Sequence, residues 1–352
     1  ACSYEVRVFG VRSAMSIARA LRLCPQAQLL PVRMSRYQEA SAAVFRIFSR
    51  YTDRIEPVSS DEAFLDLTGC ERLFGAAATV AAQIRAEVRQ ELGLTVSAGV
   101  APNKFLAKLA SEAAKPDGLL ELLPAAVEQF LLPLPVGRLW GVGAVTAERL
   151  RRQGVETVAA LRGVDKALLR RWFGSSGELL WFLARGEDDR PVQAVEGAKS
   201  IGAEETFAHD LSDPDELRRE LLALAERVAR RVRRLQLVGC CLTLKVRYAD
   251  FETVTRSQTL AEGIDHAPAL CQEAEALLAR TEAGRRPVRL LGVTLSRLCA
   301  KGIGQQSLFQ ADGERKEALD QALDHLHRRF GEGGVCRASL LGRRLPLQPE
   351  ED

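Results

Sequence analysis

Residues 58–68 have the sequence Val58-Ser59-Ser60-Asp61-Glu62-Ala63-Phe64-Leu65-Asp66-Leu67-Thr68. Two adjacent carboxylates, Asp61 and Glu62, open an otherwise apolar run that is typical of a β-strand. Because neighbouring strand residues point to opposite faces, the two charges cannot both be hidden in a core. At least one of them is therefore expected to face a cleft, and the whole of 55–68 is expected to form a β-hairpin with its turn near Ser59 and Ser60.

A second informative segment lies downstream. Residues 97–104 have the sequence Ser97-Ala98-Gly99-Val100-Ala101-Pro102-Asn103-Lys104, which predicts a short strand that turns into a helix. That helix is followed by Lys115-Pro116-Asp117-Gly118. An acidic pair, a strand-to-helix turn and a lysine at a helix end form an arrangement suited to holding metal ions and a triphosphate.

Paired carboxylates serve in general acid–base catalysis, in metal binding, or simply as surface charge, and the residues alone leave all three open. The apolar flanks of Asp61 and Glu62 weaken the surface interpretation. Carboxylate oxygens suit Mg²⁺, which commonly uses one or two carboxylates together with substrate phosphates. Two such ions activate an attacking oxygen and stabilise a leaving one, which is what nucleotidyl transfer requires.

The hydrophobic patterns predict an α+β chain of several domains. In the first part, the predicted helices and strands span residues 13–23, 36–51, 55–68, 71–92, 94–100, 103–114 and 118–122, and a helical region follows over 124–190. A polar linker leads into a second, independent α/β unit, with helices over 214–234 and 267–280 and strands over 240–248, 253–260 and 288–297. A last helix is predicted over about 314–330.

Composition excludes some classes of protein. Of the 352 residues, 47% are hydrophobic and 27% charged, as in ordinary globular proteins, and no apolar run is long enough for a membrane span. The eight cysteines form no CxxC pair and have no histidine at zinc-ligand spacing, so a zinc site is not expected. Scattered single cysteines are typical of a reducing cytoplasm.

The net charge of +3 does not by itself indicate a polyanionic partner. Basic residues nevertheless gather in one region of the second unit, at Arg227, Arg230, Arg231, Arg233, Arg234, Lys245, Arg247, Arg285, Arg286 and Arg289. One such cluster is most simply a solvated helix face. Several of them together favour contact with a phosphate backbone.

A Gly-Val-Gly turn at Gly141 and Gly143 opens a predicted helix that carries Arg149. A plain tight turn explains two glycines equally well. Followed by a basic helix, the turn also fits a helix-hairpin-helix element that grips a DNA backbone without sequence preference.

The pentapeptide at residues 305–309 combines Gln305 with Leu308 and Phe309 in a loop-like segment. It either tucks into its own domain or acts as a linear motif whose apolar side chains fill a pocket on a partner.

Four motifs, at residues 3–15, 51–66, 97–108 and 115–118, resemble in this order the Y-family translesion DNA polymerases, most closely the bacterial DNA polymerase IV (DinB) group. The resemblance covers residues 1 to about 300. It implies a right-hand architecture with fingers at 1–33, a palm with a βαβ-type sheet at 34–122, a helix-hairpin-helix thumb at 123–190, a linker at 191–199, an α/β little finger at 200–298 and a clamp-binding tail at 299–352.

The resemblance also implies roles for single residues. Asp61 and Glu62 would bind two Mg²⁺ ions and carry catalysis. The other implied contacts are Tyr4, Arg7 and Lys115 with the triphosphate, Gly141, Gly143, Arg149, Lys245 and Arg247 with DNA, and Gln305, Leu308 and Phe309 with the sliding clamp (β subunit). The implied partners are primer-template DNA, deoxynucleoside triphosphates and the clamp. No membrane partner is expected, and the protein is expected to act as a cytoplasmic monomer.

The family pattern opens with a strand that carries a further metal-binding aspartate, and this chain begins after it. The expectation is therefore an N-terminally truncated polymerase that lacks one of three metal carboxylates and an interior palm strand, and that is inactive or poor as written. The alternative is a non-catalytic DNA- and clamp-binding relative, which would have little reason to retain Asp61, Glu62, Arg7 and Lys115. A helix-hairpin-helix nuclease is a weaker third hypothesis because it would not need Tyr4 and Arg7.

Overall fold

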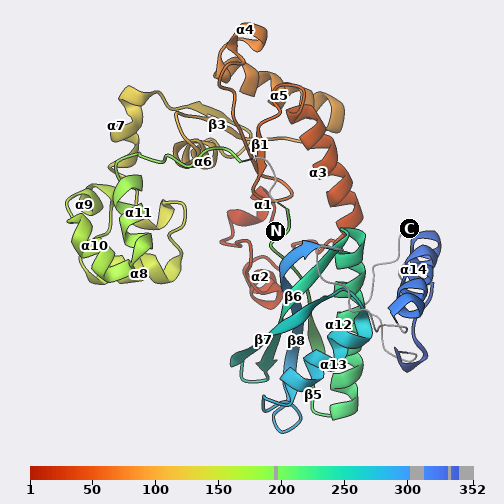
Figure 1. The fold of residues 1–352 in the computed structure, drawn as a ribbon. Helices are drawn as coiled ribbons and strands as arrows, with labels where there is room; N and C mark the ends of the chain where they lie inside the picture. Colours follow the sequence, from red (N-terminus) through yellow and green to blue (C-terminus); the bar gives the residue numbers. More distant parts are fainter. Residues whose placement is uncertain (194–196, 302–312, 332–333, 341–352) are drawn as a thin grey trace. The chain divides into compact units, whose positions relative to one another are not determined.

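A computed structural model gives the fold of residues 1–193, 197–301, 313–331 and 334–340. The chain divides into two compact units, and the division falls between Glu196 and Gly197. Both units are drawn in Figure 1. None of the helices within the described ranges combines the length and the apolarity that a membrane crossing needs.

The first half of unit 1 combines small sheets with helices. Its elements are α1 (Tyr4–Arg7), α2 (Ile17–Leu23), α3 (Met34–Phe48), β1 (Ile55–Pro57), β2 (Ala63–Leu65), α4 (Glu71–Phe74), α5 (Ala77–Leu92), β3 (Ala98–Val100), α6 (Lys104–Ala113) and β4 (Leu119–Glu121). Strands β1 and β2 form an antiparallel hairpin, whereas β3 and β4 are parallel and joined through α6. The predicted hairpin, the predicted helix over 103–114 and the βαβ unit are therefore present.

The predicted helix over 71–92 is wrong as a single element. Gly75 separates α4 from α5, because its backbone has φ +85° and ψ −166°, a conformation that no helix contains. The end of α5 is as predicted, since Gly93 adopts the left-handed conformation that closes many helices. Helix α5 packs on α3 around Ile47, Val80 and Val88, which are fully buried.

The second half of unit 1 is helical, with α7 (Val127–Leu131), α8 (Ala144–Arg152), α9 (Val158–Arg162), α10 (Lys166–Phe173) and α11 (Ser175–Leu183). Its core is continuous with α6, because Phe105 and Leu106 are buried in one cluster with Leu131, Leu150 and Leu183. Helix α6 therefore packs on two sides. One face contacts the small sheets, and the other face completes the core of the helical part.

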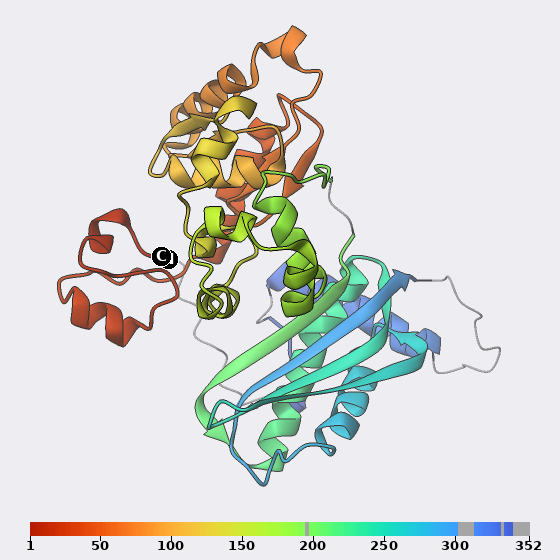
Figure 2. The ribbon, with the colours of Figure 1, turned by 90° about the vertical axis from the view of Figure 1, so that its left-hand side faces the viewer.

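Unit 2 is a four-stranded antiparallel sheet in the order β5-β8-β6-β7, with two helices on one face (Figure 2). Its elements are β5 (Ser200–Leu211), α12 (Pro214–Arg234), β6 (Leu237–Tyr248), β7 (Thr253–Ile264), α13 (Ala267–Leu278) and β8 (Val288–Ala300). Leu242, Leu244 and Val246 alternate with more exposed residues along β6 and pack beneath α12 and α13. The α+β multidomain class predicted from the sequence is confirmed.

Strand β5 was not predicted. It lies at an edge of the sheet, and only Ile201 and Ala203 of its twelve residues are buried. An edge strand of this kind buries too little apolar surface to produce a clear alternation of hydrophobic and polar residues.

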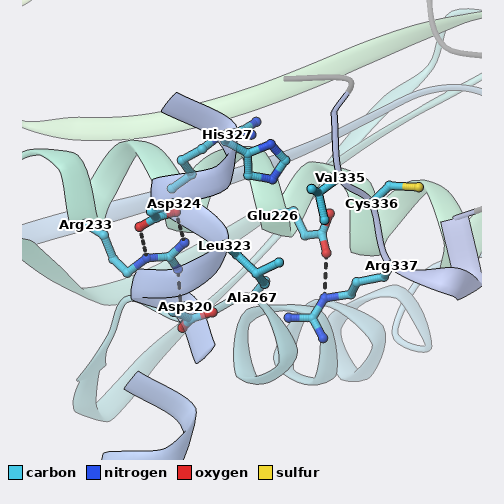
Figure 3. A pocket seen from close by; sticks show the side chains of 11 residues that line it. Glu226, Arg233, Ala267, Asp320, Leu323, Asp324, His327, Val335, Cys336 and Arg337 are labelled. Atoms are coloured by element: carbon cyan, nitrogen blue, oxygen red, sulfur yellow. Dashed lines mark hydrogen bonds and ion pairs between the residues drawn. The ribbon is translucent and has the colours of Figure 1, made fainter. Parts of the chain in front are cut away.

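Helix α14 (Gly313–Phe330) packs on α12 of the same unit through ion pairs (Figure 3). Arg233 of α12 donates to both carboxylate oxygens of Asp324, at 2.7 and 2.8 Å, and lies 3.4 Å from Asp320. Glu226 of α12 receives a hydrogen bond from Arg337 at 2.5 Å. Part of the predicted basic stretch on α12 is thus paired with acids of its own unit.

Candidate active site

The acidic pair lies in the turn between β1 and β2. The turn is closed by a hydrogen bond from Val58 N to Glu62 O of 2.9 Å. The Ser59 hydroxyl lies 2.6 Å from Asp61 Oδ1, and Asp61 is exposed. Glu62 is only partly exposed. The turn therefore presents one open carboxylate and one that contacts a neighbouring element.

That neighbouring element is α6, which sends two lysines to the hairpin. Lys108 Nζ lies 2.9 Å from Glu62 Oε2. Lys104 Nζ, one helical turn earlier, lies 3.0 and 2.7 Å from the two carboxylate oxygens of Glu56 in β1. Because residues four apart share one face of a helix, both lysines face the hairpin. Lys104 binds strand β1, and Lys108 binds the turn.

Lys115 lies just beyond α6, with its ammonium group 2.6 Å from Glu112. The hydrogen bond with Glu112 raises the pKa of Lys115 above its usual value, burial opposes this, and the charges of Glu112 and Glu62 add smaller increases. Glu112, which contacts Lys115, lies one helical turn after Lys108, which contacts Glu62. The acidic turn and the lysine after α6 therefore lie along the same side of this helix.

Tyr4 and Arg7 lie together in α1, with the Arg7 guanidinium 5.0 Å from the centre of the Tyr4 ring. Within the described residues, Arg7 Nε is buried and has no hydrogen-bond partner. A buried guanidinium N–H without a partner is costly, so it favours the arrival of an acceptor. Phosphate oxygens are acceptors of this kind.

The donor set at the turn suits a divalent cation in part. Asp61 offers an exposed carboxylate that contacts the Ser59 hydroxyl, whereas Glu62 is already engaged by Lys108. No group of three or more His, Cys, Asp or Glu side chains in metal-binding geometry occurs among the described residues. A cation here would thus take its remaining ligands from water and from a substrate, as Mg²⁺ commonly does.

The predicted helix-hairpin-helix turn precedes α8. Gly141 has φ +91°, which favours glycine, and Gly143 is the extended N-cap residue of the helix. A Cβ atom on either glycine would meet no heavy atom within 4 Å, so the backbone at this turn is open to an approaching group. Arg149 lies on α8 with its guanidinium 4.9 Å from the Phe173 ring centre.

The other residues predicted to contact DNA, Lys245 and Arg247, lie in unit 2. Lys245 Nζ is 2.9 Å from Glu204 and Arg247 Nε donates to the Thr253 hydroxyl at 2.9 Å. Both side chains lie on β6, and Lys245 is partly neutralised by its partner. The predicted clamp-binding residues Gln305, Leu308 and Phe309 fall outside the described residues.

Sequence reasoning missed the residues that support the turn. Lys104 and Lys108 lie inside the motif at residues 97–108, but the sequence assigned no role to them or to Glu56. Their signal was the spacing of two lysines by four residues in a helix predicted to follow a strand beside an acidic hairpin. That signal cannot be interpreted without knowing that the helix packs on the hairpin.

Comparisons with known proteins cover almost all of the chain. Residues 1–112 match the impB/mucB/samB family, residues 124–155 the helix-hairpin-helix motif of the same group, and residues 198–308 the C-terminal domain of the impB/mucB/samB family. A protein named DNA polymerase IV from Desulfatibacillum aliphaticivorans is 47% identical over 342 residues, which is 96% of this chain and 86% of the relative. Another of that name, from Alkalilimnicola ehrlichii, is 47% identical over 85% of this chain and 84% of its own length.

Solved structures of Y-family polymerases are also similar to this chain. A Y-family DNA polymerase chimera of Dbh and Dpo4 aligns with a TM-score of 0.76 and 27% identity, over 85% of this chain and 87% of the other. The crystal structure of DinB from Sulfolobus solfataricus aligns with a TM-score of 0.55 and 28% identity, over 84% and 86% of the two chains.

Proposed function

Because the chain belongs to the impB/mucB/samB family and is a Y-family DNA polymerase of the translesion type, we propose that it adds deoxynucleotides to a primer at the turn that carries Asp61 and Glu62. The observation that supports this location most strongly is the chain of contacts along α6, where Lys108 contacts Glu62 and, one turn later, Glu112 contacts Lys115. Acids that can hold cations therefore lie near a lysine that can hold a triphosphate. Arg7 in α1 adds a buried guanidinium N–H that has no partner among the described residues.

The proposed cofactor is Mg²⁺, as two ions, held by Asp61 and Glu62 together with ligands from the substrate. When bound, the ions would activate the attacking hydroxyl and neutralise charge on the leaving group. The chain's own residues would do the rest by positioning, since phosphoryl transfer depends mostly on placement and electrostatics. Arg7 and Lys115 would bind the phosphates of the incoming nucleotide, and Lys108 would fix the orientation of Glu62.

The proposed DNA contacts are the backbone at Gly141 and Gly143, the side chain of Arg149, and Lys245 and Arg247 on β6. An open glycine turn at the start of a helix supports a phosphate contact in the first case. All eight cysteines are free thiols, which supports the proposed cytoplasmic location. We propose that the protein acts as a monomer.

A Lys115→Ala variant tests the nucleotide-binding role. We expect the KM for deoxynucleoside triphosphates to rise about tenfold, because a phosphate contact made by a single ammonium group contributes roughly 1.4 kcal/mol. Steady-state primer extension by the purified protein, with the triphosphate concentration varied, measures this. Arg72→Ala, which removes an exposed cation from α4, is the matched control. A changed affinity for DNA with an unchanged KM would contradict the assignment.

The pentapeptide that contains Leu308 and Phe309 is proposed to bind the sliding clamp, on the strength of its sequence and of the family. Replacing both residues by alanine should remove the stimulation of primer extension by a loaded bacterial clamp and should spare extension without the clamp. The physical reason is that apolar anchors carry most of the binding energy of such short motifs. Ser307→Ala serves as the control. Equal loss of both activities would mean that the pentapeptide stabilises the protein instead.

A further inference from the structure

The hairpin that carries the acidic turn has little internal support. Its strands are three residues long, and an isolated two-stranded hairpin is marginally stable at best. Asp61 is exposed, and the ion pair between Lys108 and Glu62 is open to solvent, with the Glu62 side chain 42% exposed. Exposed pairs of this kind stabilise weakly. The placement of the turn must therefore depend on another contact.

The contact between Lys104 and Glu56 has the properties required. The Lys104 side chain is 9% exposed and that of Glu56 is 24% exposed, so this pair is far less screened than the outer one. Glu56 is paired with Phe64 across the hairpin, and the ammonium group of Lys104 lies 5.6 Å from the centre of the Phe64 ring. One buried lysine of α6 thus contacts both strands of the hairpin, through the carboxylate of Glu56 in β1 and the ring of Phe64 in β2.

The chain that leaves the helical part of unit 1 takes part in the same contact. We call residues 186–193 the exit segment. The backbone N–H of Gln193 donates to Glu56 Oε2 at 2.8 Å, the same oxygen that Lys104 approaches to 2.7 Å. Glu56 therefore joins the hairpin, α6 and the exit segment at one carboxylate.

Two further bonds fasten the exit segment to the start of α6. The side-chain amide of Asn103 donates to Gly186 O at 2.8 Å. Asp188, whose side chain is 1% exposed, accepts from Phe105 N at 3.2 Å and is bound by Arg190 at 2.6 and 2.9 Å. Backbone N–H groups in the first turn of a helix lack partners within the helix, and Asp188 supplies one. The exit segment is consequently held where its Gln193 amide meets Glu56.

We propose that Glu56 is a positioning residue for the acidic turn, and that the exit segment contributes to this positioning through the hydrogen bond from its Gln193 amide. This inference rests on the proposed function only in so far as its tests measure kcat. Loss of either contact would let the turn move relative to α6. The chemical step would slow, while the groups that bind DNA and nucleotide would stay in place.

Gln193 offers a sharp test because its side chain is exposed while its amide is bonded. Gln193→Pro removes the N–H donor, and Gln193→Ala keeps it. We expect Gln193→Pro to lower kcat in primer extension about tenfold, since small misplacement of catalytic groups is costly, with the KM for nucleotide and the Kd for DNA within about twofold. Gln193→Ala should behave as the unaltered protein.

Glu56 provides the second test. Glu56→Ala should lower kcat by about 50-fold, and Glu56→Gln, which keeps an oxygen acceptor for the Gln193 amide, should recover part of that loss. Val88→Ala, a core truncation in the α3–α5 cluster, is the control for lost stability and should lower the Tm without changing kcat. A fall in Tm with unchanged kcat for both Glu56→Ala and Gln193→Pro would overturn the proposal.

Hydrogen exchange gives a readout that needs no activity. In Gln193→Pro, the amides of residues 55–65 should exchange at least about threefold faster than in Gln193→Ala, because local opening governs their exchange. If the unaltered protein fails to extend a primer, the proposed function fails, yet this comparison still decides the positioning role. Equal exchange in the two variants would contradict it.

Discussion

Replacing Asp61 by alanine should abolish nucleotide addition while leaving DNA binding nearly intact. Asp61 is the open carboxylate of the turn, and its loss would remove a ligand of the proposed cations. Charge stabilisation by such ions is worth several kcal/mol, so the rate of single-turnover primer extension should fall roughly 10³-fold. The Kd for primer-template DNA, measured by fluorescence anisotropy, should change by less than about twofold, because DNA affinity comes mainly from contacts with its phosphates.

The matched control for this experiment is Asp53→Ala. Asp53 is an exposed aspartate eight residues earlier in the chain, and it lies outside the turn. Its replacement removes the same charge from the same unit, so it should preserve both rate and affinity. A large loss of DNA affinity in Asp61→Ala would mean that the carboxylate shapes the DNA-binding surface. Full retention of the rate would refute the proposed location of catalysis.

Replacing Gly99 by alanine should destabilise unit 1 strongly. Gly99 lies in β3 where α6 crosses it, and a Cβ atom there would lie 2.1 Å from the backbone oxygen of Ala107 and 2.3 Å from the backbone nitrogen of Ser111. Backbone atoms in a helix cannot yield as a flexible side chain can, so α6 itself would have to shift. Overpacking of this kind costs about 3 kcal/mol. For a unit of this size, the Tm measured by calorimetry should fall by roughly 6–12 °C.

Gly143→Ala is the comparison that isolates the cause. A Cβ at Gly143 would meet open space, and its φ of −77° is accessible to alanine, so the Tm should stay within about 2 °C of the unaltered value. A Gly99→Ala protein of unchanged Tm would show that α6 does not approach β3 as closely as the structure has it. The lysines of α6 would then need a different account.

Local features of unit 1 could be predicted because they depend on neighbours in the sequence. Gly93 ends α5, and Asn103 begins α6 by accepting from Leu106 N at 3.0 Å, as short polar residues at helix starts commonly do. The acidic turn itself followed from two carboxylates within an apolar run.

The support of the turn could not be predicted in the same way. Glu56, Lys104 and Asp188 act through contacts between residues 48 or 83 positions apart, and no local pattern encodes such pairings. The same reason applies to β5, whose place at the sheet edge depends on β8 far along the chain. The arginines of α12 are a further example. Their run of positive charge did not indicate that Arg233 would pair with Asp324 of α14, which lies 91 positions later.

The two lysines of α6 restrict how this segment can change in evolution. Each added or deleted residue rotates the remainder of a helix by about 100°, so a single insertion between Lys104 and Lys108 would turn one of them away from the hairpin. Substitutions elsewhere on α6 can be absorbed by adjusting neighbours, but a change of length there cannot. Insertions and deletions should therefore be purged from residues 104–108 more strictly than conservative replacements.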